Sequence, residues 1–103
     1  MQILVVDDNA DNRQMVRDLL LVMGHEPILA IDGYQALDIL AEADIHFALV
    51  DWMMPKMDGL ELIKRMRAQF SERYIYVIML TAKNAHDDVA TGLEVGADDY
   101  VSK

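Results

Sequence analysis

Short hydrophobic runs alternate with amphipathic stretches along the whole chain, and this alternation constrains the fold more than any other feature. The clearest run, at residues 3–6, is aliphatic throughout and ends at Asp7. A strand of this kind is typical of a parallel sheet that is covered on both faces. The stretch at 11–23 has hydrophobic residues at helical spacing and stops before Gly24, a residue favoured just beyond a helix.

The same periodicity predicts five strands and four helices in strict alternation. The strands are expected at residues 3–6, 26–30, 47–50, 74–80 and 98–101, and the helices at 11–23, 33–41, 60–69 and 87–95. Strands that alternate with helices in this way form a parallel sheet with helices on both faces. The predicted fold class is therefore α/β, a doubly wound five-stranded parallel sheet.

Composition excludes several classes of function. The chain has 103 residues, which suits one domain, and its net charge of −9 opposes direct binding to nucleic acid or to anionic lipid. The absence of cysteine excludes disulfides, thiolate nucleophiles and zinc–thiolate sites. Hydrophobic runs are far shorter than the ~20 residues of a membrane span. With a strand pattern from the first residues and no signal-peptide pattern, we expect a cytoplasmic protein.

Polar residues follow four of the five predicted strands. Asp7 and Asp8 follow the first strand, Asp51 the third, Thr81 the fourth and Lys103 the fifth. Because the carboxyl ends of parallel strands open at the same edge of a sheet, we expect these side chains to meet in one pocket.

The chemistry of this set favours phosphoryl transfer. Three carboxylates in one pocket repel each other unless a cation lies between them, and oxygen ligands suit Mg²⁺. Asp51 is the hardest of these residues to explain as merely structural, since a charge directly after a buried strand is costly without a partner. A carboxylate nucleophile, a metal ion, a hydroxyl and an amine together suit the formation of an aspartyl phosphate.

Four motifs, in order and at matching spacing, make the chain similar to the receiver domain of two-component response regulators. The motifs are the pair Asp7-Asp8, LVDWMMPKMDG at 49–59, MLTA at 79–82 and GADDYVSK at 96–103. Each motif alone is weak, but the four in order are strong, and the resemblance covers the whole chain. The resemblance implies a flavodoxin-like sheet with strand order 2-1-3-4-5.

The resemblance also implies roles at the acidic end of the pocket. Asp51 is expected to accept a phosphoryl group from the phosphohistidine of a sensor histidine kinase or a histidine phosphotransfer protein. Asp8, Asp51 and the backbone carbonyl of Met53 are expected to bind Mg²⁺, and Asp7 to act mainly through a metal-bound water.

Further roles implied by the resemblance concern the phosphoryl group and the response to it. Lys103 is expected to contact the phosphoryl oxygens, with the backbone N–H of Ala82 as a further contact. Thr81 is expected to shift toward the phosphoryl group while Tyr100 moves from exposed to buried. The positions that tune the lifetime of the aspartyl phosphate hold Met53 and Lys83, which predicts a long-lived phosphoryl state.

Receiver domains usually continue past the lysine with a proline and another helix. The resemblance therefore implies a receiver domain at 1–103 that is truncated at its C-terminus and lacks an output domain. The sheet face that carries the helix at 11–23 is then expected to be half uncovered, so that a homodimer is possible.

The expected function is a phosphorylation-gated signalling switch that is not an enzyme, although it assists its own phosphorylation and dephosphorylation. One alternative is a small Mg²⁺-dependent phosphatase that forms an aspartyl phosphate. It is disfavoured because Met53 stands where a second acid is needed, two residues after Asp51. The other alternative is a phosphorylation-independent protein-interaction module, which the intact set of site residues disfavours.

Overall fold

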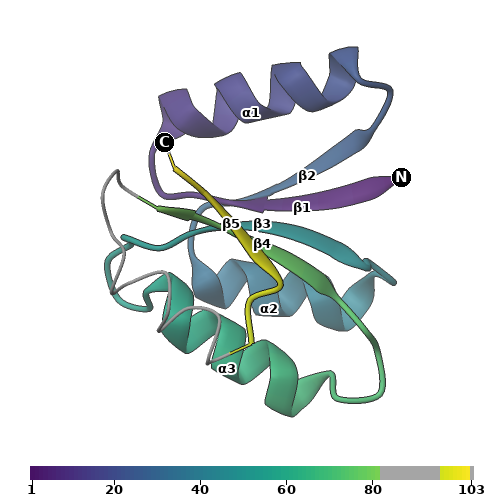
Figure 1. The fold of residues 1–103 in the computed structure, drawn as a ribbon, viewed down its shortest axis with the longest axis vertical. Helices are drawn as coiled ribbons and strands as arrows, with labels where there is room; N and C mark the ends of the chain where they lie inside the picture. Colours follow the sequence, from purple (N-terminus) through teal and green to yellow (C-terminus); the bar gives the residue numbers. More distant parts are fainter. Residues whose placement is uncertain (82–95, 103) are drawn as a thin grey trace.

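Five parallel strands form a single sheet at the centre of the molecule (Figure 1). The computed structural model describes residues 1–81 and 96–102. The strands are β1 (Gln2–Val6), β2 (Glu26–Ala30), β3 (Phe47–Asp51), β4 (Tyr76–Thr81) and β5 (Asp99–Ser102). Their order across the sheet is β2-β1-β3-β4-β5, which confirms the predicted fold class and strand order.

Helices cover both faces of the sheet. Helix α1 (Ala10–Val22) lies on one face, whereas α2 (Gly33–Glu42) and α3 (Gly59–Gln69) lie together on the other (Figure 1). This arrangement confirms the doubly wound architecture. The helix predicted at 87–95 falls outside the described residues.

A short polar side chain begins each of these three helices. The side-chain oxygens of Asn9, Asp32 and Asp58 accept backbone N–H groups three residues further on, at 3.0, 2.8 and 2.9 Å. Such caps satisfy N–H groups that have no partner within the helix, and each stabilises a helix by about 1 kcal/mol.

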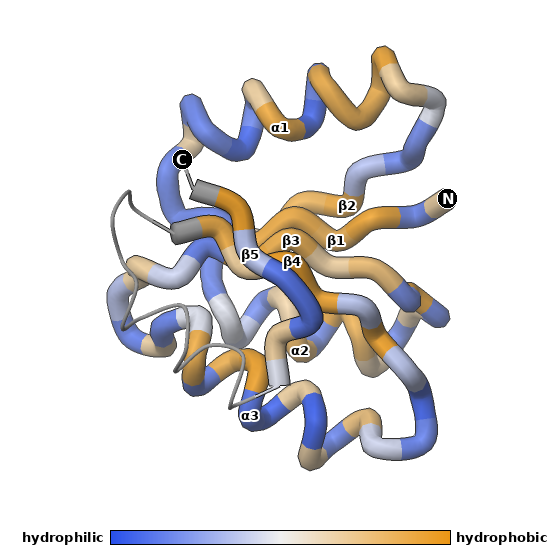
Figure 2. The backbone as a smooth tube through the Cα atoms, in the orientation of Figure 1, coloured by the Kyte–Doolittle hydropathy of each residue, from blue (hydrophilic) through white to orange (hydrophobic). Residues whose placement is uncertain are grey.

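The hydrophobic core is divided unevenly between the two faces. Alternate residues of β1 point to opposite faces, so Leu4 and Val6 join the large cluster beneath α2 and α3. Among the described residues, the buried cluster on the α1 face is small and consists of Ile3, Val5 and Leu20. The central strands are the hydrophobic centre of the molecule (Figure 2). Exposed hydrophobic residues on and just after α1 are Met15, Leu19, Leu21, Val22 and Met23.

The start of β4 differs from the sequence prediction. A strand was expected from residue 74, but β4 begins at Tyr76. The carbonyl of Tyr74 accepts a hydrogen bond from the His46 ring, and that of Ile75 accepts one from the Arg67 guanidinium. Side chains therefore use the backbone groups that would otherwise extend the strand.

Candidate functional site

Three carboxylates meet at the carboxyl edge of the sheet. Asp7 directly follows β1, and Asp51 ends the neighbouring strand β3. One carboxylate oxygen from each of Asp7, Asp8 and Asp51 lies within 4.8 Å of the other two. Asp7 and Asp51 are 1% and 4% exposed, and Asp8 is exposed. The structure thus brings together the acidic residues that the sequence placed in one pocket.

Three hydrogen bonds hold Asp7 in place. Its backbone N–H donates to the carbonyl of Ala30, the last residue of β2, at 3.2 Å. One of its carboxylate oxygens accepts the backbone N–H of Asn9 at 2.9 Å. Its carbonyl accepts a hydrogen bond from the guanidinium of Arg13, in the first turns of α1, at 2.7 Å. Both the backbone and the carboxylate of Asp7 are therefore oriented by the protein.

The loop that follows Asp51 closes tightly. The N–H of Trp52 donates to the carbonyl of Leu80 at 3.0 Å, and the N–H of Gly59 donates to the carbonyl of Trp52 at 2.8 Å. A Cβ atom at Gly59 would lie 2.7 Å from the carbonyl oxygen of Asp51, so a larger residue cannot stand there without a shift of the backbone. Trp52 is 8% exposed and directly follows Asp51, which makes it a natural optical reporter of the site.

The remaining predicted site residues lie in or near the neighbouring strands. Thr81 ends β4, the strand next to β3. Tyr100 lies in β5 and is 41% exposed, and Met53 is 70% exposed two residues after Asp51. Ala82 and Lys103 fall outside the described residues, so their predicted contacts with a phosphoryl group stay predictions.

The acidic cluster has the chemistry of a metal site. Carboxylate oxygens are hard ligands that suit hard divalent cations, and a cation between them offsets their mutual repulsion. Two of the three carboxylates are buried and one is exposed, so the cluster is supported by the protein on one side and accessible on the other. Asp7, Asp8 and Asp51 could therefore hold a metal ion.

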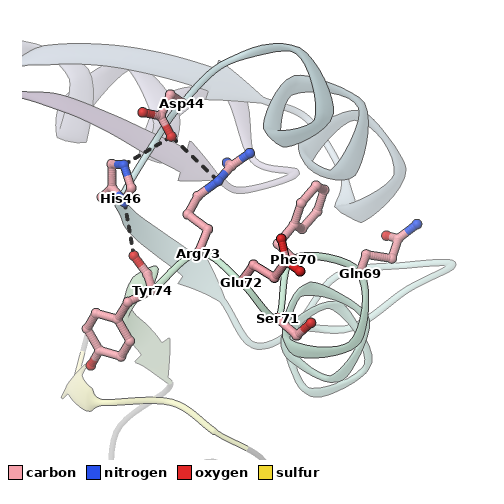
Figure 3. Close-up of a pocket in the computed structure, with 8 residues that line it drawn as sticks. All are labelled: Asp44, His46, Gln69, Phe70, Ser71, Glu72, Arg73 and Tyr74. Carbon is pink, nitrogen blue, oxygen red and sulfur yellow. Dashed lines mark hydrogen bonds and ion pairs between the residues drawn. The ribbon is translucent and has the colours of Figure 1, made fainter.

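A pocket of about 700 Å³ lies at the opposite edge of the sheet (Figure 3). It includes Asp44 and His46, which precede β3, whereas Asp51 ends that strand. Arg73, which also lines the pocket, donates to the carbonyls of Leu40 and Ala43 at 3.0 and 3.1 Å, beside the end of α2. These polar groups close the end of a helix and are separate from the acidic cluster.

A strand order of 2-1-3-4-5 with acids at the carboxyl edge defines a flavodoxin-like α/β protein that can bind a ligand there. Residues 3–103 match the family described as the response regulator receiver domain. The chain belongs to this family, and it is a phosphoacceptor domain of two-component signalling.

Three similar proteins illustrate the range of the family. A chemotaxis protein CheY homolog of Campylobacter jejuni is 35% identical, over all of this chain and 81% of its own length. The phosphate regulon transcriptional regulatory protein PhoB of Pseudomonas aeruginosa is 41% identical over 98% of this chain and 44% of its own length. The receiver domain of Ssk1, in a co-crystal with the histidine phosphotransfer protein Ypd1 of Saccharomyces cerevisiae, gives a TM-score of 0.89. That comparison has 27% identity and covers all of this chain and 78% of the other.

Arg13 is a contributor to the site that the sequence analysis missed. The signal available in the sequence is a cation near the start of a predicted helix, the end at which the helix dipole disfavours positive charge.

Residues 1–81 and 96–102 contain no helix with the length and hydrophobicity needed to cross a membrane.

Proposed function

We propose that Asp51 accepts a phosphoryl group in an Mg²⁺-dependent reaction and that this modification switches the domain between two signalling states. The observation that carries the proposal is the convergence of Asp7, Asp8 and Asp51 within 4.8 Å in a chain of the receiver family. The resemblance to the family assigns the acceptor role to Asp51, and its place at the end of β3, close to Asp7 and Asp8, supports that assignment.

In the proposed reaction a carboxylate oxygen of Asp51 attacks the phosphorus atom of a phosphohistidine. The new P–O bond forms as the P–N bond breaks, and the imidazole leaves with a proton. Bound Mg²⁺ supplies positive charge that offsets the charge of the phosphoryl oxygens. Asp8, Asp51 and the Met53 carbonyl would hold the ion, and Asp7 would act mainly through a metal-bound water.

Two groups would stabilise the transferred phosphoryl group. The ammonium of Lys103 would pair with its oxygens, and the backbone N–H of Ala82 would donate a hydrogen bond to it. Thr81 would then move toward the phosphoryl group. Tyr100, 41% exposed on the edge strand β5, would become buried, so that the surface around β5 changes for a partner.

The proposed partners follow from the same chemistry. The phosphodonor is a sensor histidine kinase or a histidine phosphotransfer protein, as the co-crystal of Ypd1 with the Ssk1 receiver domain supports. The response passes to an output domain or a downstream effector, since PhoB is a longer protein in which this chain matches 44% of the length. We propose a cytoplasmic domain, at 1–103, that acts as a switch and not as an enzyme on separate substrates.

Intact-mass measurement after treatment with acetyl phosphate and Mg²⁺ tests this function. The wild type is expected to gain the mass of one phosphoryl group, and Asp51→Asn to gain none. Asp99→Asn is the control, because it removes an exposed carboxylate outside the cluster and is expected to be labelled like the wild type.

Three results would contradict the proposal. Labelling of Asp51→Asn would place the acceptor elsewhere. An unlabelled wild type that retains its fold would favour a phosphorylation-independent interaction module, and steady turnover of a phosphomonoester would favour a phosphatase.

A further inference from the structure

We infer that Arg13 is a positioning residue for the metal site. Its guanidinium holds the peptide that joins Asp7 to Asp8, and thereby fixes the backbone from which both carboxylates extend before any ion is present. The inference rests on the proposed Mg²⁺-dependent function and assigns a role to a residue outside the ligand set.

The contact that carries this inference is the 2.7 Å hydrogen bond from the Arg13 guanidinium to the carbonyl of Asp7. That carbonyl and the N–H of Asp8 belong to one planar peptide unit, so an interaction that fixes the carbonyl also fixes the start of Asp8. The carboxylate of Asp7 is oriented separately, by the N–H of Asn9. Without Arg13, the backbone between the two acids would lose its hydrogen bond to α1.

The place of Arg13 on α1 supports a specific role. It is the fourth residue of the helix, and side chains there point back toward the N-terminus, which explains how the guanidinium reaches Asp7. A cation near the N-terminus of a helix is disfavoured by the helix dipole. The hydrogen bond from the guanidinium to the Asp7 carbonyl offsets this cost.

Charge and positioning predict opposite results when Arg13 is removed. A positive charge beside a metal site repels the cation, so loss of the charge alone would tighten Mg²⁺ binding. Loss of the hydrogen bond to Asp7 would loosen the backbone between the two acids and weaken Mg²⁺ binding, as is typical for residues that orient metal ligands. The direction of the change in the dissociation constant therefore distinguishes the two.

The experiment compares Mg²⁺ dissociation constants, by calorimetry and Trp52 fluorescence, for the wild type, Arg13→Gln and Arg13→Lys. We expect the dissociation constant of Arg13→Gln to rise about tenfold. We expect that of Arg13→Lys to rise as well, because lysine keeps the charge but carries its nitrogen one bond nearer the backbone than the guanidinium nitrogen that donates to the Asp7 carbonyl. The matched control is Arg17→Gln, which removes the same charge one turn further along α1, where Arg17 pairs with Asp18 at 2.9 Å. It is expected to change the constant by less than about twofold.

Each outcome decides the question. An unchanged or lower dissociation constant for Arg13→Gln overturns the positioning role, as does an Arg13→Lys variant that binds like the wild type. If Arg13→Gln does not fold, Arg13→Lys alone decides. A wild type that binds no Mg²⁺ overturns the proposed function together with this inference, whereas normal wild-type binding with unaffected Arg13 variants overturns the inference alone.

Discussion

The carboxylate of Asp98 lies 3.1 Å from the guanidinium of Arg67, and this pair joins the last turns of α3 to the residue that precedes β5. The same carboxylate accepts the backbone N–H of Val77 at 2.8 Å and the hydroxyl of Tyr74. Arg67 also donates to the carbonyl of Gly96 at 3.1 Å. One carboxylate thus links α3, β4 and the approach to β5, the strand that carries the proposed switch residue.

Asp98→Asn is expected to lower the free energy of unfolding by about 2 kcal/mol, because an amide replaces one acceptor oxygen with a donor and leaves charged or backbone donors unsatisfied. Urea denaturation followed by circular dichroism measures this change. The neighbouring Asp99→Asn is the control, since Asp99 is exposed and its substitution is expected to change stability by less than about 0.5 kcal/mol. Equal effects of the two substitutions would show that the contacts of the Asp98 carboxylate add nothing to stability.

Mg²⁺ is expected to stabilise the folded protein, because the native acidic cluster binds the ion and the unfolded chain has no such site. At a concentration 100 times the dissociation constant, the gain in the free energy of unfolding is about 2.7 kcal/mol. The fluorescence of Trp52 should change over the same titration, since this buried side chain directly follows Asp51. Thermal unfolding and fluorescence titration are the two measurements.

Asp8→Asn provides the control for the Mg²⁺ titration. It removes the exposed carboxylate of the cluster and leaves the two buried ones, so it should weaken both responses to Mg²⁺. Responses in the variant that equal those of the wild type would place the ion outside the cluster.

His46 is expected to titrate above the ordinary histidine range. A hydrogen bond to the Tyr74 carbonyl raises the pKa of the His46 ring, and the side chain of Asp44 raises it further (Figure 3). A histidine pKa that is raised on folding contributes stability below the unfolded value of about 6.5, and this contribution is lost as the pH rises through the folded value. Titration of the His46 ring by NMR, in the folded and the urea-unfolded protein, measures both values.

Asp44→Asn should lower the pKa of folded His46 only in part, because the carbonyl of Tyr74, the larger cause, remains. The free energy of unfolding of the wild type should fall as the pH rises above the ordinary histidine pKa. His46→Gln should not show this fall. A folded pKa at or below the unfolded value would contradict the expectation.

Met53 is expected to make the aspartyl phosphate long-lived. Its thioether is a weak hydrogen-bond acceptor, 70% exposed two residues after Asp51, and cannot orient an attacking water. Met53→Asn should shorten the lifetime, measured as loss of the phosphoryl mass after the phosphodonor is removed. Met23→Asn, at a methionine 63% exposed beyond the end of α1, should leave it unchanged. Loss from the wild type within seconds would contradict this prediction.

Patterns within single segments predicted most of the fold. The aliphatic run of β1 and the helical spacing of α1 are properties of short segments, so the sequence alone indicates them. The convergence of Asp7 and Asp51 was also predictable, because the carboxyl ends of parallel strands share an edge. The roles of these residues came from the resemblance to a family and not from periodicity.

Contacts between distant side chains could not be predicted. Arg67 and Asp98 lie 31 residues apart in the sequence, and no pattern within either segment indicates that they pair. The later start of β4 was also not predictable, because it depends on hydrogen bonds from side chains of other segments to the Tyr74 and Ile75 carbonyls. Arg13 was missed because a single arginine on an amphipathic helix is usually a solvated charge, and only the direction of its side chain toward Asp7 shows otherwise.

The uneven division of the hydrophobic core between the two faces has a consequence for local opening of the structure. Among the described residues, the buried cluster that joins α1 to the sheet is only Leu20 of the helix with Ile3 and Val5 of β1. Helix α1 should therefore open locally at less cost than α2 or α3, and its amide hydrogens should exchange sooner with solvent. Asn9 and Arg13, at the start of this helix, nevertheless donate hydrogen bonds to Asp7. An ion bound by the acidic cluster would therefore tie the start of α1 to the sheet, and its binding should slow the exchange of the amide hydrogens along α1.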